Sequence, residues 1–270
     1  MHNMFDYLPT PKFGLIGHRG AAALAPENTL ASFKKAASIG LNWIEFDVQP
    51  CASGEWVIMH DETLDRTTNG RGLVAETPYD IIKTLDAGSW FHPDYKNEKV
   101  PLLQETLDLL VDLNLHPNIE LKINPPPSNI RSKHANILTA SSLSGYIDSF
   151  LKVLERAWPK RLPPPLISSF DLELLKVLSQ TSSQKNNPPL PIGYLVDTLT
   201  STATDLVIKH QFQSCHCDQK SLKNQEIYYA VSQHVPLLVY TVNDKNQLHT
   251  LLEMGVSAVF SDMTINILPA

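Results

Sequence analysis

The chain has 270 residues, of which 43% are hydrophobic, 19% are charged and 8% are aromatic, and its formal net charge is −6. This composition excludes a disordered tail, and no run of about 18 apolar residues suggests a transmembrane helix. The acidic balance argues against sequence-independent binding to nucleic acid and against stable membrane association, because both need a broad cationic surface.

Short β-branched or aromatic runs alternate with longer helical patterns along the chain. Eight strands interleaved with helices match the count of a TIM (β/α)₈ barrel in the α/β class, and an open doubly wound sheet is the alternative. We therefore predict a single barrel domain over residues 1–270. In the last predicted helix, Asp244 suits the N-cap and Gly255 the C-terminal stop. The predicted barrel strands cover residues 14–18, 43–48, 118–123, 166–170, 191–196, 212–218, 236–242 and 257–262.

One region interrupts this alternation, and we predict an insertion there at about 51–114, after the second barrel strand. It contains an extra strand at 56–60, the polar segment DETLDRTTNGRG and a mixed segment that ends in the helical pattern TLDLLVDLN. Insertions at that place lie over the C-terminal face of a barrel, where the active-site loops gather. We expect residues 70–100 of the insertion and the proline-rich loop at 125–127 to decide which alcohol of the substrate fits.

The second and third predicted barrel strands, WIEFDV and NIELKI, alternate apolar and charged residues. Successive side chains of a strand point to opposite faces, so the apolar sets would pack under the helices and the charged sets would face the barrel interior. Burying charges costs several kcal/mol each unless they are paired or bound to an ion. The inward charged set is Glu45, Asp47, Glu120 and Lys122.

Two interpretations of these charges remain open from spacing alone. One divalent cation, Mg²⁺ or Ca²⁺, could be held by Glu45, Asp47 and Glu120, because hard cations prefer oxygen ligands. Alternatively, Lys122 and Arg19 could close a salt-bridge cluster with the same carboxylates.

Two histidines lie at the ends of predicted strands, His18 in GHRG and His60 in MHDETL. A pair of histidines can supply the proton donor and the proton acceptor needed to cleave a phosphate ester near neutral pH. Arg19 follows His18 with a planar donor fork that suits phosphate, and Gly20 allows close backbone approach. For His60 taken alone, a surface turn residue is the alternative.

Taken together, the motifs resemble those of glycerophosphodiester phosphodiesterases. The resemblance rests on GHRGAAALAPENTLASFKKAASIG, IEFDVQ, VIMHDETLDRTTNGRG, IELK, SSFD, VYTVND and GVSAVFSD, in that order along nearly the whole chain. It implies a TIM-barrel phosphoric diester hydrolase that uses one divalent cation to cleave glycerophosphodiesters to sn-glycerol 3-phosphate and an alcohol. It further implies metal ligation by Glu45, Asp47 and Glu120, acid-base catalysis by His18 and His60, and phosphate binding by Arg19 and Lys122.

Several functional alternatives stay beside this interpretation. A related phosphodiesterase could act on lysophospholipids, a barrel could bind a phosphodiester without cleaving it, or Lys122 could form a Schiff base. The partner expected from the resemblance is a small soluble glycerophosphodiester, because the chain carries no basic amphipathic helix. The sequence does not assign which histidine is the acid, whether water or a substrate hydroxyl attacks, which alcohol is preferred, or the oligomeric state.

Two aromatic residues and three cysteines complete the set of candidate residues. Tyr240 stands where the family often has Trp, so Tyr240 and Phe170 could line an apolar wall for the substrate, or both could be ordinary core aromatics. Cys51, Cys215 and Cys217 cannot all pair, and buried structural cysteines are favoured over a zinc site at Cys215-His216-Cys217 because alternate residues face opposite ways. The first segment, MHNMFDYLPTPKFG, lacks a secretory pattern. Together with the unpaired cysteines, it predicts a cytoplasmic protein.

Overall fold

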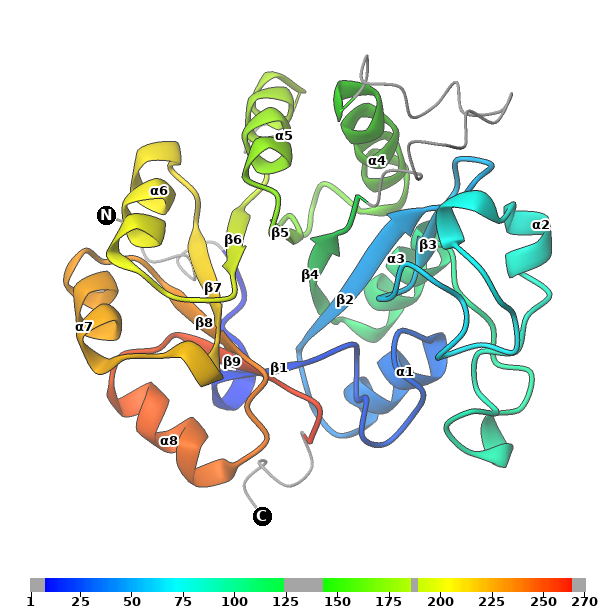
Figure 1. Ribbon diagram of the computed structural model, residues 1–270, viewed down its shortest axis with the longest axis horizontal. Coiled ribbons are helices and arrows are strands. Elements are labelled where there is room, and N and C mark those ends of the chain that lie inside the picture. The colour runs from blue at the N-terminus through cyan, green and yellow to red at the C-terminus, as the bar shows by residue number, and fades with distance from the viewer. Residues whose placement is uncertain (1–7, 124–142, 186–188, 264–270) are drawn as a thin grey trace.

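Eight parallel strands close into a barrel in the computed structural model of the chain (Figure 1), which describes residues 8–123, 143–185 and 189–263. The strands follow the order β1-β9-β8-β7-β6-β5-β4-β2, and pairing of β1 with β2 closes the ring. The predicted TIM barrel is therefore confirmed, and the open sheet is excluded. The barrel strands are β1 (Leu15–Gly17), β2 (Trp43–Pro50), β4 (His116–Leu121), β5 (Leu166–Ser169), β6 (Ile192–Val196), β7 (Ser214–Asp218), β8 (Leu237–Tyr240) and β9 (Ala258–Ser261).

Helices surround the barrel and cover its outer face (Figure 1). Side chains cap several of them: Thr29 accepts a hydrogen bond from the Ser32 amide, and Asp244 accepts one from the Gln247 amide. Asp244 is thus the predicted N-cap, and Gly255 follows that helix with φ of 94°, which glycine adopts readily. The helices are α1 (Leu30–Ser38), α3 (Leu103–Leu113), α4 (Leu143–Ala157), α5 (Leu172–Lys185), α6 (Ser201–His210), α7 (Asn224–Ser232) and α8 (Lys245–Glu253).

Residues 51–102, between β2 and α3, form an addition to the regular alternation of strands and helices. Strand β3 (Trp56–Ile58) pairs antiparallel with β2, and it is followed by η3 (Val74–Glu76), α2 (Tyr79–Ile82) and η4 (Pro93–Tyr95). Of the predicted insertion 51–114, the part before α3 is the addition, because α3 is the helix that connects the adjacent barrel strands β2 and β4. This addition has a small apolar core of its own, made of Cys51, Val57, Met59, Leu64, Val74, Ile82, Ala87 and Val100.

The barrel interior is apolar at one end and charged at the other. Its apolar end is filled by side chains from several strands, and the alternating apolar residues of β2 and β4 pack outward under the helices. Trp43 belongs to the interior set, and Glu45 and Asp47 follow it on the same face toward the C-terminal end of β2. The carboxylates therefore lie above an apolar plug, which consists of Leu8, Ile16, Trp43, Leu166, Leu238, Ala258 and Phe260.

His116 begins β4 and is buried in an aromatic setting. Its ring centroid lies 4.2 Å from that of Trp43 and 6.1 Å from that of Trp158. Burial lowers the pKa of His116 from an ordinary value near 6.5 to about 3. Between these two values the unfolded chain binds a proton that the folded chain does not, so the free energy of unfolding decreases as the pH falls.

Replacing His116 with Phe removes this titration and keeps an aromatic ring. Relative to the unmodified protein, His116→Phe is expected to gain up to about 1.4 kcal/mol of stability for each pH unit below about 6.5. Urea unfolding at pH 7, 6 and 5 measures this difference. Parallel stability curves for the two proteins over that range would contradict a neutral buried His116.

Candidate active site

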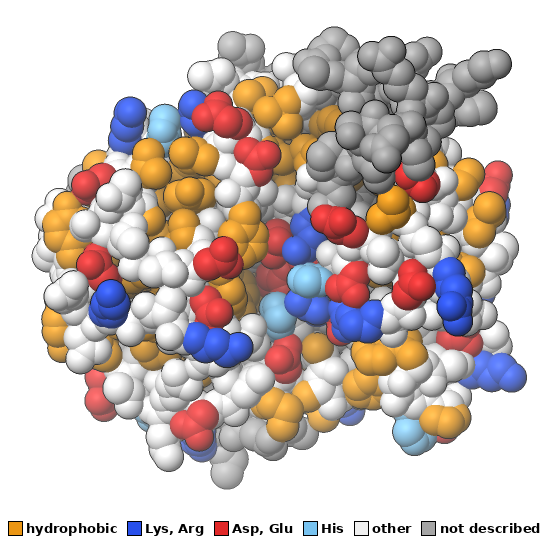
Figure 2. Space-filling model, in the orientation of Figure 1, with side chains coloured by type: hydrophobic (Ala, Val, Ile, Leu, Met, Phe, Trp, Pro, Cys, Tyr) orange, Lys and Arg blue, Asp and Glu red, His pale blue; other side chains and the backbone are white. Residues whose placement is uncertain are grey.

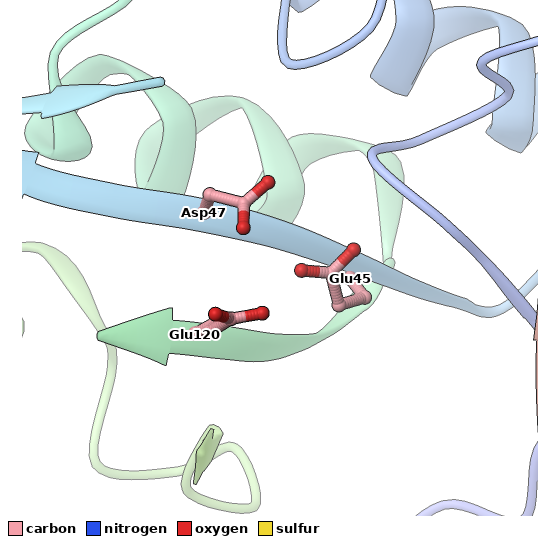
Figure 3. Close-up of side chains that lie close together, drawn as sticks. All are labelled: Glu45, Asp47 and Glu120. Atoms are coloured by element: carbon pink, nitrogen blue, oxygen red, sulfur yellow. The ribbon is translucent and has the colours of Figure 1, made fainter. Parts of the chain in front are cut away.

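Three carboxylates from two neighbouring strands meet inside the barrel (Figure 3). Strands β2 and β4 pair in parallel with Asp47 opposite Glu120, while Glu45 lies two residues earlier on the same face of β2. Figure 3 shows the three side chains on the same side of these strands, with the carboxylates turned toward one another. One oxygen of each carboxylate lies within 4.8 Å of the others. The predicted inward charged face of these strands is therefore present.

The electrostatics of this cluster favour a bound cation. Burial, with the charges of Asp47 and Glu120, raises the pKa of Glu45 well above its ordinary range. Burial and Asp47 also raise the pKa of Glu120 to about 7. The buried Oε1 atom of Glu45 has no hydrogen-bond partner within the described residues. An all-oxygen donor set with a free buried oxygen fits a hard divalent ion.

Asp47 has the opposite behaviour because cations and an amide surround it. Its carboxylate lies 3.3 Å from Lys122 Nζ and 3.6 Å from Arg19 Nε, and Asn28 Nδ2 donates to it at 2.8 Å. Burial alone would raise the pKa of Asp47, but Lys122 and Arg19 outweigh it and lower that pKa. Lys122 also lies 2.8 Å from Glu120. The predicted salt bridges exist, yet they leave Glu45 Oε1 unpaired.

His18 follows β1, and a carboxylate from the other end of the chain holds it. Its Nδ1 lies 2.7 Å from Asp262 Oδ1, and its Nε2 lies 3.9 Å from Glu45 Oε2. Burial would raise the pKa of Asp262, but the hydrogen bond and charge of His18 lower it, so Asp262 is an ionised acceptor. Asn243 donates to the second oxygen of Asp262 at 3.1 Å. The proton of neutral His18 therefore lies on Nδ1, and Nε2 is free beside the carboxylates.

His60 follows β3 and has the same arrangement with a different carboxylate. Its Nδ1 lies 2.7 Å from Asp61 Oδ1. Hydrogen bonds from Arg66 lower the pKa of Asp61 to about 2, so Asp61 also accepts and Nδ1 of His60 donates. Burial lowers the pKa of His60 itself, and the charges of Arg19 and Lys122 act in the same direction. His60 is therefore suited to accept a proton at Nε2.

Backbone geometry brings Arg19 into the cluster. Arg19 has φ of 53° and Gly20 has φ of 90°, which turns the chain so that the Arg19 amide donates to Glu45 Oε2 at 3.0 Å. The Arg19 guanidinium donates to Glu27 at 2.6 Å. Figure 2 shows histidine, acidic and basic side chains gathered in a hollow on this face of the molecule. Arg19 and Lys122 therefore bring two cations against the clustered carboxylates.

Phe170 and Tyr240 lie together, at the ends of β5 and β8. Their rings meet edge to face with centroids 6.2 Å apart, and the Tyr240 hydroxyl donates to the Val196 carbonyl at 2.9 Å. Phe170 is 43% exposed, so it is not a core aromatic, whereas Tyr240 is half-buried. The proline-rich loop 125–127, expected to act with the insertion on substrate choice, lies outside the described residues.

The cysteines do not form a metal site among the described residues. Cys215 and Cys217 pack outward in the main core, whereas His216 points inward and bonds Ser214 Oγ at 2.8 Å. All three cysteines are buried and free, which agrees with the prediction of buried structural cysteines at Cys215 and Cys217. In the described part of the chain, the one group of three or more metal-ligating side chains is Glu45, Asp47 and Glu120.

Reasoning from the sequence missed the side chains that hold these groups. They occur in the quoted motifs: two in PENT, two in HDETLDRTTNG and one in VFSD. Their presence in motifs that resemble the family could have marked them as candidate site residues. Strand alternation could not assign their partners, because these residues lie outside the strands. The missed residues are Glu27, Asn28, Asp61, Arg66 and Asp262.

Comparisons with known proteins agree on one family. Residues 18–265 match the "Glycerophosphoryl diester phosphodiesterase family". A glycerophosphodiester phosphodiesterase of Bacillus subtilis is 32% identical, covering 92% of this chain and 82% of that protein. One of Caldanaerobacter subterraneus is 30% identical, covering 92% of this chain and 93% of that protein. A solved Oleispira antarctica phosphodiesterase in complex with the product sn-glycerol-3-phosphate is 31% identical with a TM-score of 0.82, covering 98% of each chain.

Within residues 8–123, 143–185 and 189–263, no helix combines the length and the apolar character that a membrane span requires.

Proposed function

The chain belongs to the glycerophosphoryl diester phosphodiesterase family, and from this premise we propose that it hydrolyses glycerophosphodiesters to sn-glycerol 3-phosphate and an alcohol, with one divalent cation. One observation carries the proposal most strongly. Two histidines, each with Nδ1 bound to a carboxylate, lie in a site with three clustered carboxylates and two cations. This set supplies acid-base groups and positive charge together, which cleavage of a phosphodiester requires.

In the proposed reaction the bond between phosphorus and the alcohol oxygen breaks. The attacking hydroxyl, from water or from the glycerol, loses its proton to Nε2 of His60, whose lowered pKa favours the neutral acceptor form. His18, in its protonated form, donates from Nε2 to the departing alcohol oxygen. If the glycerol hydroxyl attacks, a water molecule then opens the cyclic phosphate with the two histidines in exchanged roles.

Charge on the phosphate is balanced by the cationic groups of the site. Arg19 and Lys122 each lie beside an oxygen of Asp47 and would bind the non-bridging phosphate oxygens. Glu45, Asp47 and Glu120 would hold Mg²⁺ or Ca²⁺, which when bound supplies Lewis-acid stabilisation of the negative charge. The unpartnered Glu45 Oε1 and the oxygen-only donor set support this assignment.

Phe170 and Tyr240 would form an apolar wall beside the leaving alcohol. The exposure of Phe170 and its edge-to-face contact with Tyr240 support this role.

A Schiff-base role for Lys122 is disfavoured, because Asp47 and Glu120 outweigh burial and raise the Lys122 pKa, which keeps the amine protonated. The three free cysteines support the proposed cytoplasmic location.

A coupled assay for released glycerol 3-phosphate tests the function. We expect turnover of glycerophosphocholine and glycerophosphoethanolamine, weak turnover of a lysophospholipid, and loss of activity after exhaustive EDTA dialysis that Mg²⁺ or Ca²⁺ restores. Preferential lysophospholipid cleavage would instead indicate a lysophospholipase D. Binding of glycerophosphodiesters without product release would indicate a non-catalytic barrel, and full activity after dialysis would remove the cation from the mechanism.

A further inference from the structure

Arg66 joins two carboxylates that contact the site from different parts of the chain. Its Nε and Nη2 atoms donate to Asp61 at 2.6 and 2.9 Å. Its Nη1 and Nη2 atoms donate to Glu27 at 2.8 Å each. Asp61 is five residues away in sequence, whereas Glu27 is 39 residues away. One guanidinium therefore ties the addition after β2 to the segment that precedes α1.

Each of these carboxylates also contacts a group proposed to act on the substrate. Asp61 Oδ1 accepts from His60 Nδ1 at 2.7 Å, and Glu27 Oε1 accepts from Arg19 Nη1 at 2.6 Å. A continuous series of hydrogen bonds thus runs from His60 through Asp61, Arg66 and Glu27 to Arg19, and negative and positive groups alternate along it from Asp61 onward. Arg66 lies at its centre, and its hydrogen bonds are the largest cause of the lowered pKa of Asp61.

His60 needs such support more than His18 does. His18 directly follows a barrel strand, and its partner Asp262 is itself held by Asn243 and by the adjoining end of β9. His60 lies two residues beyond β3 in irregular backbone, and its side chain is 34% exposed. In the described part of the chain, the bond to Asp61 is the one side-chain hydrogen bond that orients the imidazole of His60.

We propose that Arg66 is a positioning residue for the reaction: its guanidinium fixes Asp61 against Glu27, and thereby fixes the tautomer and orientation of His60 relative to Arg19. The inference deepens the proposed function and rests on it. Arg66 itself has its donors turned to protein carboxylates and acts through His60. A guanidinium is required because a planar fork can bond two carboxylates at once, whereas a lysine ammonium is a single point charge.

The chain offers a matched control in Arg71. It lies in the same polar segment, is exposed, and has no ion pair or side-chain hydrogen bond in the described part of the chain. Arg71→Ala therefore removes the same charge from the same segment without touching the series. Arg66→Lys keeps the charge and removes the fork, which separates electrostatic attraction of the substrate from positioning.

Steady-state kinetics give the first test. Arg66→Ala is expected to lower kcat on the order of 10- to 100-fold with KM changed less than about twofold, and Arg66→Lys to remain similarly impaired. Arg71→Ala should match the unmodified enzyme, and millimolar guanidinium should partly restore kcat of Arg66→Ala. An unchanged kcat in Arg66→Ala, or a raised KM with unchanged kcat as expected for direct substrate binding, would overturn the proposal.

A second test does not depend on turnover. In ¹⁵N-histidine NMR spectra, with the His60 signals assigned by their absence in His60→Gln, we expect protonated Nδ1 in the unmodified protein and a mixture of tautomers in Arg66→Ala. The Arg71→Ala spectrum should show no change. If no glycerol 3-phosphate is released by the unmodified protein, the proposed function fails while this tautomer shift still decides the role of Arg66. An unaltered His60 signal in Arg66→Ala overturns the positioning role.

Discussion

Replacing His60 or His18 with Gln is expected to lower kcat by about 10³-fold, because each histidine supplies one of the two proton transfers. Glutamine can still form a hydrogen bond but cannot accept or release a proton near neutral pH. His60 lies in irregular backbone with its side chain 34% exposed, so His60→Gln should leave the fold intact. The measurements are kcat from glycerol 3-phosphate release and the thermal unfolding temperature of each variant.

The control for these variants is His249→Gln, because His249 is exposed on α8, away from the carboxylate cluster. It should retain full activity. In the unmodified enzyme kcat/KM should decrease as the pH falls through the pKa of His60, which lies below 6.5, since the base must be neutral to act. Near-normal kcat in both histidine variants would contradict the assignment of the two acid-base groups.

Glu45→Gln and Asp47→Asn are expected to abolish cation-dependent activity, with a fall of at least about 10²-fold, but to affect the cation-free protein in opposite ways. Glu45 Oε1 is buried without a partner, so a neutral amide removes a desolvation cost and maintains or raises stability. Asp47 is paired with Lys122, Arg19 and Asn28, so Asp47→Asn leaves buried cations uncompensated and lowers stability.

Thermal unfolding with and without Mg²⁺ or Ca²⁺ measures both effects. In the unmodified protein a cation at 100 times its dissociation constant should add about 2.7 kcal/mol to the free energy of unfolding. Both variants should lose most of this gain. A full cation-induced shift in either variant would contradict ligation by this cluster. A clear destabilisation by Glu45→Gln in EDTA would contradict an unpaired Glu45 carboxylate in the cation-free protein.

The part of the site that lies on strands could be predicted because strand alternation is local. Glu45, Asp47 and Glu120 face inward for the same reason that Ile44, Phe46 and Ile119 pack outward, and a two-residue period is readable in the sequence. Cys215 and Cys217, which are also two residues apart on one strand, both pack outward for this reason.

The partner of His18 and the contact between Arg66 and Glu27 could not be predicted in this way. His18 and Asp262 are separated by 244 residues, and only closure of the barrel brings them within 2.7 Å. The contact of Arg66 with Glu27 depends on how the polar segment after β3 folds over the barrel, which no periodicity encodes. The C-terminal boundary of the predicted insertion was placed too late for a related reason. The sequence of α3 is apolar on one face, and this pattern is the same whether the helix packs against the barrel or against an added segment.

The pairing of β1 with β9 has a consequence for the biosynthesis of the enzyme. The groups proposed to act on the substrate, from His18 to Lys122, are translated within the first 122 residues. Asp262, which binds His18, comes only after β9. At the end of β9 the His18 amide also donates to the Ser261 carbonyl at 3.0 Å. A nascent chain that ends before β9 has an open barrel with exposed edges at β1 and β8. Catalytic competence should therefore arise in one step late in translation, and the growing polypeptide would not cleave substrate before then.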